Sequence, residues 1–308
     1  CKGQEKTPLS RLEKSGLGRG SICAILEKTH GAGAPGCKTD CGKVCCNMEL
    51  QTVGFIGFGN MAQAMARGLL RGGEAPRLFA CAKRWEKLQA SAGALGATPC
   101  RDAGEVLENA QVLIAAVKPY LIEEVLAPIR DRLEGKLLLS VAAGWDFARF
   151  EKILPAGVHH LSVMPNTPVS VGEGVVLLEE ENSLTSQELA QVKELLAPLG
   201  TVETVPSSQM GIAGTLSGCG PAYAAMFLEA LGDAGVFHGL PRELAYRLAA
   251  QMLAGAGKLH LETGEHPGAM KDAVCSPGGT TILGVAELER RGFRGAVMEA
   301  IHAVQKGR

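Results

Sequence analysis

The sequence predicts an α/β fold, in which a doubly wound sheet of about eight strands is followed by an all-α domain. Two observations carry this prediction. From residue 52 to about residue 207, short apolar runs alternate with helical patterns, which is typical of parallel sheets with crossover helices. Beyond residue 207 strand patterns stop and long Ala- and Leu-rich helical patterns take over. We therefore predict one domain over residues 48–207 and a second over residues 208–308.

Composition is that of an ordinary globular protein. The 308 residues are 46% hydrophobic and 20% charged, so a packed core is possible in both domains. The net charge of −1 gives no reason to expect nucleic acid or an anionic membrane as a partner. No uninterrupted apolar run approaches the roughly 18–20 residues of a membrane span.

The first 47 residues differ from the rest. They hold six of the ten cysteines and show no strand or helix periodicity, and Met48 directly precedes the first strand pattern. We expect residues 1–47 to be an unstructured extension, and an artefact of the gene model is one explanation for it. A mitochondrial transit peptide is the alternative, but the acidic residues and cysteines of the segment disfavour it. The segment lacks the paired His spacing of a zinc site, so no metal is expected. The four later cysteines are scattered, as buried thiols are in a reducing compartment such as the cytoplasm.

The first strand pattern runs into a glycine-rich turn and then a helix. Gly57 allows a tight turn, Gly59 lets backbone N–H groups approach a pyrophosphate, and Ala62 allows close packing of the helix. This is the fingerprint of a Rossmann-like dinucleotide-binding domain, with a merely tight strand–helix turn as the alternative. The residues that we expect to contact the cofactor here are Ile56, Gly57, Phe58, Gly59, Asn60 and Met61.

The second strand pattern, 77–82, ends where an NAD enzyme usually carries an acid that binds the adenosine ribose. Lys83 and Arg84 follow instead. Two cations can bind a 2′-phosphate, so this strand end favours NADP over NAD. The alternative is that both side chains are simply solvated charges at the end of the strand. Asp102 and Glu105 then have the spacing of a helix cap.

Two apolar runs, 111–117 and 136–144, are predicted to be buried parallel strands. In doubly wound sheets ligands lie beyond the carboxyl ends of the strands, so the residues at these ends should line the nicotinamide side of the cofactor. A structural surface role is the alternative for the lysine among them. The residues concerned are Val117, Lys118, Pro119, Ala142 and Ala143.

Three more strands are predicted, at 159–168, 174–178 and 201–205. His159 and His160 are neighbours on the first of these, so they should face opposite sides of the sheet, and we interpret them as structural. Thr185 and Glu188 have the spacing of a capping box at the start of an amphipathic helix.

The helical patterns at 222–231 and 242–261 are apolar on more than one face, more than a 100-residue unit can bury, which predicts dimerisation through this domain. Two glycine-rich stretches, 214–223 and 274–282, are predicted to be loops that interrupt these helices. Loops of exposed N–H groups and hydroxyls at helix starts bind anions such as a carboxylate. Plain helix starts are the alternative.

Several separated motifs, in the same order along the chain, resemble those of pyrroline-5-carboxylate reductases, and most of all those of the vertebrate cytosolic third isoform. The resemblance spans residue 53 to about residue 305. The motifs lie at residues 53–62, 116–119, 164–168, 216–223, 266–268 and 276–282.

This resemblance implies reduction of 1-pyrroline-5-carboxylate to L-proline with NADPH or NADH, the last step of proline biosynthesis. A protonated imine is already electrophilic, so positioning rather than a strong protein acid would supply much of the acceleration. The resemblance also implies a homodimer whose sites use both subunits, commonly assembled as five dimers.

The same resemblance assigns residues. It places the substrate carboxylate on Val274, Gly278, Gly279, Thr280 and Thr281, with both threonines also near the nicotinamide. It places Ala82 where a serine usually contacts the 2′-phosphate, and Ala103 where some relatives have an adenosine-contacting Asn. The residues it suggests for catalysis are Thr215, Ser217 and Thr281.

The chain departs from the family around residue 214. The family's usual Thr, whose hydroxyl approaches the imine nitrogen, is Gly214 here, Thr215 comes one residue late, and Cys219 replaces a Ser. Either Thr215 points elsewhere, which the unchanged spacing up to Tyr223 favours, or the backbone is shifted and Thr215 donates instead.

Two rival functions remain open. A β-hydroxyacid dehydrogenase shares the fingerprint but depends on a helix lysine, and no matching motif surrounds Lys258 or Lys271. A non-catalytic NADPH-binding protein would also fit the altered stretch around Gly214.

Overall fold

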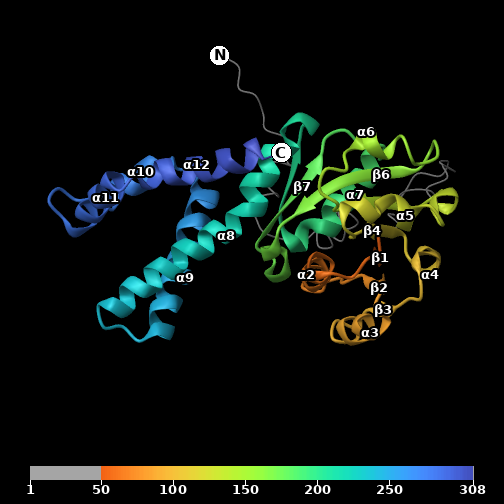
Figure 1. The fold of residues 1–308 in the computed structure, drawn as a ribbon, viewed down its shortest axis with the longest axis horizontal. Helices are drawn as coiled ribbons and strands as arrows, with labels where there is room; N and C mark the ends of the chain where they lie inside the picture. Colours follow the sequence, from red (N-terminus) through yellow and green to blue (C-terminus); the bar gives the residue numbers. More distant parts are fainter. Residues whose placement is uncertain (1–49, 308) are drawn as a thin grey trace, which may run out of the picture. The chain divides into compact units, whose positions relative to one another are not determined.

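The structure is a computed structural model that describes residues 50–307 (Figure 1). The predicted extension over residues 1–47, its cysteines and Met48 lie outside the described residues. Within residues 50–307, no helix combines the length and the apolar character that crossing a membrane requires.

An eight-stranded sheet forms the first half of the described chain, as predicted. Its order is β3-β2-β1-β4-β5-β6-β7-β8, and every neighbouring pair is parallel except β6 and β7. The strand order reverses between β1 and β4, which makes their carboxyl ends the expected ligand crevice. The strands are β1 (Thr52–Ile56), β2 (Arg77–Cys81), β3 (Thr98–Pro99), β4 (Val112–Ala115), β5 (Leu137–Ser140), β6 (His159–Pro165), β7 (Gly174–Glu179) and β8 (Gly200–Val205).

Successive side chains of a strand point to opposite faces, so the sheet contributes to two apolar cores. Val53 and Phe55 belong to the core that includes α2 (Asn60–Leu69), α3 (Trp85–Gly93) and α7 (Ser186–Leu196). Ile56 and Leu113 belong to the core that includes α4 (Ala103–Asn109), α5 (Ile122–Leu126) and α6 (Phe147–Phe150). Short 3-10 helices lie at Pro119–Leu121, Arg130–Arg132, Thr167–Val171 and Ala197–Leu199.

Both predicted helix caps are present. The Asp102 carboxylate accepts a hydrogen bond of 2.9 Å from the Glu105 N–H at the start of α4. Thr185 and Glu188 form the reciprocal bonds of a capping box at the start of α7. The two strand histidines face opposite sides: His159 pairs with Glu188 at 2.7 Å, while the buried His160 pairs with Glu151 at 2.8 Å.

The second half of the described chain is helical, as predicted, but one expected loop is absent. The prediction of a loop at residues 214–223 is wrong, because these residues continue α8 without interruption, with Pro221 inside it. A Cβ on Gly214 would collide with the Met164 sulfur, and one on Gly232 with the Tyr246 ring. Glycine at these positions therefore allows close helix packing rather than breaking the helix. The helices are α8 (Ser207–Phe237), α9 (Arg242–Thr263), α10 (Pro267–Ala273), α11 (Thr280–Arg290) and α12 (Phe293–Lys306).

These five helices expose many large apolar side chains. Neither apolar core contains a residue from α8–α12, and in the single chain Phe237 is 85% exposed and Leu261 73%. So many exposed apolar side chains on one domain favour an interface with another surface. Other large apolar residues exposed on these helices are Leu216, Met226, Leu248, Met252, Leu259, Leu283, Leu288, Val297 and Met298.

Candidate active site

The turn between β1 and α2 has the geometry that a pyrophosphate site needs. Gly57 has φ +91°, and a Cβ there would lie 2.7 Å from the Ala116 carbonyl oxygen, so only glycine fits. Gly59 caps α2 without a side-chain hydrogen bond, and a Cβ there would meet nothing within 4 Å. The first N–H groups of α2 are therefore left for an anion in front of the helix.

The carboxyl end of β2 leads into a group of cations. Ala82 follows the strand, and Lys83 and Arg84 are both exposed just before α3. The Arg101 guanidinium lies 4.0 Å from the centre of the Trp85 ring, which brings a third cation to this edge. Arg101 and Trp85 were not predicted from the sequence, because β3 is only two residues long and gives no strand pattern to mark its exit.

The predicted nicotinamide side is assembled from the ends of β4 and β5. The indole N–H of Trp145, which follows β5, donates a 2.8 Å hydrogen bond to the Pro119 carbonyl, and so joins the two strand exits. Val117 is half-buried, beside the Gly57 turn, and Lys118 is exposed. Small residues continue the wall beyond β5, with Ala142 buried and Ala143 exposed.

The end of β6 is tied to α8 through Asn166. Its amide nitrogen donates to the Ser217 carbonyl at 3.0 Å, and its amide oxygen accepts from the Val175 N–H at 2.9 Å. Asn166 is only 6% exposed, so its side chain acts as a buried bridge between sheet and helix. From the sequence it was predicted only as part of the strand at 159–168.

The two hydroxyls predicted from α8 are engaged within the helical region. Thr215 is fully buried; its hydroxyl donates to the Gly211 carbonyl at 3.0 Å and accepts from the Gln305 amide at 2.6 Å. The Ser217 hydroxyl donates to the Ala213 carbonyl at 2.9 Å. The position that faces the end of β6 is instead Gly214, against Met164.

The predicted carboxylate loop precedes α11. Gly278 has φ +68°, and Gly279 caps the helix without a side-chain bond, so the first N–H groups of α11 are left for an anion. Val274 is 64% exposed, and Thr280 and Thr281 are also exposed. Helix α11 packs mainly on α12, so within one chain this loop is not assembled with the strand exits.

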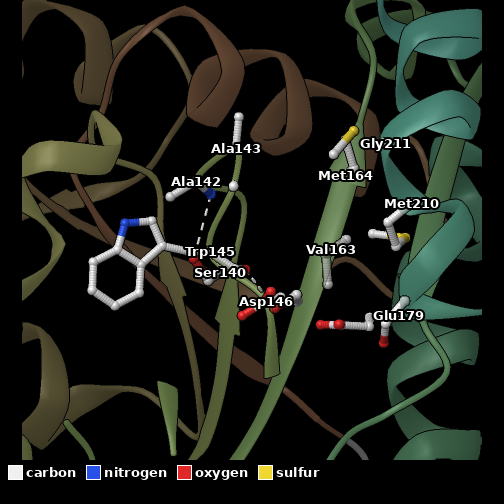
Figure 2. Close-up of a pocket in the computed structure, with 13 residues that line it drawn as sticks. Ser140, Ala142, Ala143, Trp145, Asp146, Val163, Met164, Glu179, Met210 and Gly211 are labelled. Carbon is white, nitrogen blue, oxygen red and sulfur yellow. Dashed lines mark hydrogen bonds between the residues drawn. The ribbon is translucent and has the colours of Figure 1, made fainter. Parts of the chain in front are cut away.

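A cavity of about 480 Å³ adjoins the end of β5 (Figure 2). Its walls come from the ends of β5, β6 and β7 and from the first turn of α8. Ala142 and Ala143 belong both to this wall and to the predicted nicotinamide side. The cavity therefore lies directly beside the candidate site.

Two of the later cysteines are buried, as predicted. Burial raises the pKa of the Cys81 thiol, and it raises the pKa of Cys100 to about 11. Neither thiol is a nucleophile near neutral pH. Cys219 and Cys275 are half-buried, and all four are free thiols.

Comparison with known proteins identifies relatives of both halves. Residues 207–308 match the family described as pyrroline-5-carboxylate reductase dimerisation, and residues 52–144 match NADP oxidoreductase, coenzyme F420-dependent. A pyrroline-5-carboxylate reductase of Treponema pallidum is 44% identical over 257 residues, which cover 82% of this chain and 97% of the relative. Pyrroline-5-carboxylate reductase 3 of Macaca fascicularis is 39% identical, with 82% and 92% covered.

The fold is shared with solved structures. A crystal structure of Plasmodium falciparum pyrroline carboxylate reductase with NADP bound has a TM-score of 0.74 and 30% sequence identity, and the match covers 84% of this chain and 97% of that one. A pyrroline-5-carboxylate reductase from Coxiella burnetii also has a TM-score of 0.74, at 31% identity.

Proposed function

The chain belongs to the pyrroline-5-carboxylate reductase family, and on that basis we propose that it reduces 1-pyrroline-5-carboxylate to L-proline with NADPH, in the last step of proline biosynthesis. The observation that carries this proposal is the identity of 37–44% to reductases of this name over most of the chain. Bound NADPH supplies the hydride from C4 of its nicotinamide ring.

The residues present fit this cofactor. Gly57 lets the turn lie close against Ala116, the space around Gly59 is open, and the uncapped start of α2 offers N–H groups to the pyrophosphate. Lys83 and Arg84 would pair with a 2′-phosphate, with Arg101 as a third cation nearby. The small side chains of Ala142 and Ala143 would let the nicotinamide approach the strand ends.

The substrate carboxylate would be held by the backbone at Val274 and at Gly278–Thr281, in front of α11. Because α11 packs away from the strand exits of its own chain, we propose that each site pairs one subunit's strand exits with its partner's loop. The exposed apolar side chains of α8–α12 and the dimerisation family over residues 207–308 support a homodimer. We propose that five such dimers form a decamer. We also propose that the protein is located in the cytoplasm.

The proposed chemistry depends on positioning. The Thr215 hydroxyl is held by Gly211 and Gln305, which supports the alternative in which Thr215 points away from the imine. Ser217 would act by fixing α8 against Asn166, while Thr281, exposed in the first turn of α11, would lie near the nicotinamide and the carboxylate. A protonated imine held in line with the hydride needs no strong protein acid.

The rival functions differ in what they predict for a direct assay. A β-hydroxyacid dehydrogenase would need a free lysine on a helix. Here Lys258 forms an ion pair with Glu173, and Lys271 forms one with Asp272. The purified chain should oxidise NADPH when 1-pyrroline-5-carboxylate is added, with proline formed in equal amount. NADPH binding without turnover would instead show a non-catalytic binding protein, and turnover only with a hydroxy acid and NADP would show the dehydrogenase.

A further inference from the structure

A carboxylate is buried in the wall of the cavity beside the candidate site. Glu179 ends β7 after four apolar residues, and it is only 1% exposed. Its oxygen Oε2 accepts a 2.9 Å hydrogen bond from the Phe147 N–H, while Oε1 is buried without a hydrogen-bond partner among the described residues. A buried carboxylate with one bond is costly, so this position favours a ligand that pairs with Oε1.

Further hydrogen-bond acceptors line the same cavity. Strand register places Ser140 of β5 beside Ser162 of β6, and both hydroxyls are buried. Ser162 donates to the Trp145 carbonyl at 2.8 Å, which leaves its oxygen lone pairs to accept. The Ser207 hydroxyl, in the first turn of α8, is buried without a partner among the described residues. Figure 2 shows Glu179 directed toward the segment that carries Trp145 and Asp146.

The ionisable residues that line the cavity are acidic. Glu179 and Asp146 line it, and no Lys, Arg or His of the described residues does. Arg149 lies close by, but its guanidinium donates to the Gly144 carbonyl and lies 4.4 Å from the centre of the Trp145 ring. Residues 50–307 contain no cluster of three His, Cys, Asp or Glu side chains suited to a metal ion. The cavity therefore favours an organic cation.

We propose that this cavity is a subsite for a primary alkylammonium ion. An ammonium group has three N–H donors, and we assign them to acceptors of three residues that line the cavity, Glu179, Ser162 and Ser207. The aliphatic stem lies against Val163, Met164 and Met210 in the same cavity. A volume of about 480 Å³ is that of a small-molecule site.

The test is direct binding of n-butylammonium chloride to the full chain, followed by calorimetry or ligand-observed NMR, without cofactor or substrate. We expect saturable binding of one ion per chain, and none of n-butanol, which has the same stem without the charge. Glu179→Gln, which keeps the shape and removes the charge, should weaken binding about tenfold or more. Glu180→Gln alters the adjacent exposed carboxylate and should leave binding unchanged.

Other outcomes would overturn the proposal. Equal affinity in wild type and Glu179→Gln would do so, as would binding of n-butanol as tight as that of the ammonium ion, or no binding at all. Ser207→Ala provides a second variant if Glu179→Gln does not fold, and we expect a several-fold loss from it. NADPH titration of each variant checks that the nucleotide domain is intact. The binding experiment does not depend on turnover. A lack of ammonium binding would therefore not count against the proposed reductase activity, and a lack of reductase activity would not count against ammonium binding.

Discussion

The sheet domain and the helical domain bury their apolar residues in different ways. Strands β1–β8 and helices α2–α7 enclose two cores within one chain, and Val53, Phe55 and Ile114 there are fully buried. Helices α8–α12 contribute nothing to either core and leave Met226, Phe237 and other large side chains exposed. The first domain therefore encloses its own apolar cores within one chain. The second leaves apolar side chains for another surface to cover, and the loop proposed to bind the substrate carboxylate lies in this second domain.

The largest expected effect tests the pyrophosphate turn of the sheet domain. Gly59→Val should abolish NADPH binding, because a branched side chain would occupy the space in front of α2. The fold should survive, since Gly59 has φ −79° and a Cβ there meets nothing within 4 Å. Fluorescence titration with NADPH measures the loss, and circular dichroism checks folding. An unchanged titration would show that the cofactor does not use this turn.

The next effect tests the dependence of the helical domain on a partner. Leu283→Asp places a charge on α11 where the side chain is 67% exposed in the single chain. We expect monomers by light scattering and nearly complete loss of reductase activity, with NADPH affinity unchanged. Leu70→Asp, at an exposed apolar position after α2, serves as the control and should keep both assembly and activity. A fully active Leu283→Asp monomer would contradict the shared site.

The two domains also differ in how much the sequence reveals. All strands except the two-residue β3 could be predicted, because their apolar runs are bounded by turn residues, and the caps at Asp102 and Thr185 follow local rules. The loop predicted at residues 214–223 was wrong, because glycine that permits close packing and glycine that ends a helix look alike without knowledge of the neighbour, here Met164. Tertiary contacts decide between them.

In the candidate site, too, some features follow from local sequence patterns and others depend on tertiary contacts. The Gly57 turn follows from local backbone chemistry and was predicted. The bond from Asn166 to the Ser217 carbonyl joins residues 51 positions apart, so no local pattern reveals it. Glu179 had a weak signal, an acid directly after an apolar strand, but its burial depends on packing against Phe147 and α8.

Cofactor choice should depend on the cations at the end of β2. Lys83→Ala combined with Arg84→Ala should weaken NADPH binding more than NADH binding, because only NADPH carries the 2′-phosphate. Both side chains belong to exposed residues, so the difference should be at most a few kcal/mol. Parallel titrations with the two cofactors measure it. Equal losses would show that these cations do not bind the 2′-phosphate, and Arg101→Ala would then be the variant to compare.

Thr215 and Gly214 separate a structural hydroxyl from a catalytic one. Thr215→Val removes the 2.6 Å bond from the Gln305 amide and leaves that amide only the Gly211 carbonyl, 3.5 Å away, so we expect a loss of about 1–2 kcal/mol in unfolding free energy. Its kcat should change little. Gly214→Thr must displace the Met164 side chain, and it should raise kcat, up to about tenfold, if the new hydroxyl reaches the imine. If Thr215→Val instead lost most of its kcat at unchanged stability, and Gly214→Thr had a lower kcat than wild type, then Thr215 would be the donor to the imine nitrogen.

The smallest effect concerns a pH-dependent contact within the sheet domain. Burial alone would raise the pKa of Glu188, but hydrogen bonds from Thr185 and His159 outweigh it and hold the pKa below its ordinary value. A carboxyl whose pKa is lowered in the folded state stabilises the fold above its unfolded pKa, and this stabilisation is lost as pH falls through the folded pKa. Glu188→Gln should therefore cost about 0.5–1 kcal/mol at pH 7, and urea denaturation curves of variant and wild type should converge under acid conditions. A constant difference at all pH values would mean that the charge of Glu188 is not the cause and that Gln does not reproduce the geometry of the cap.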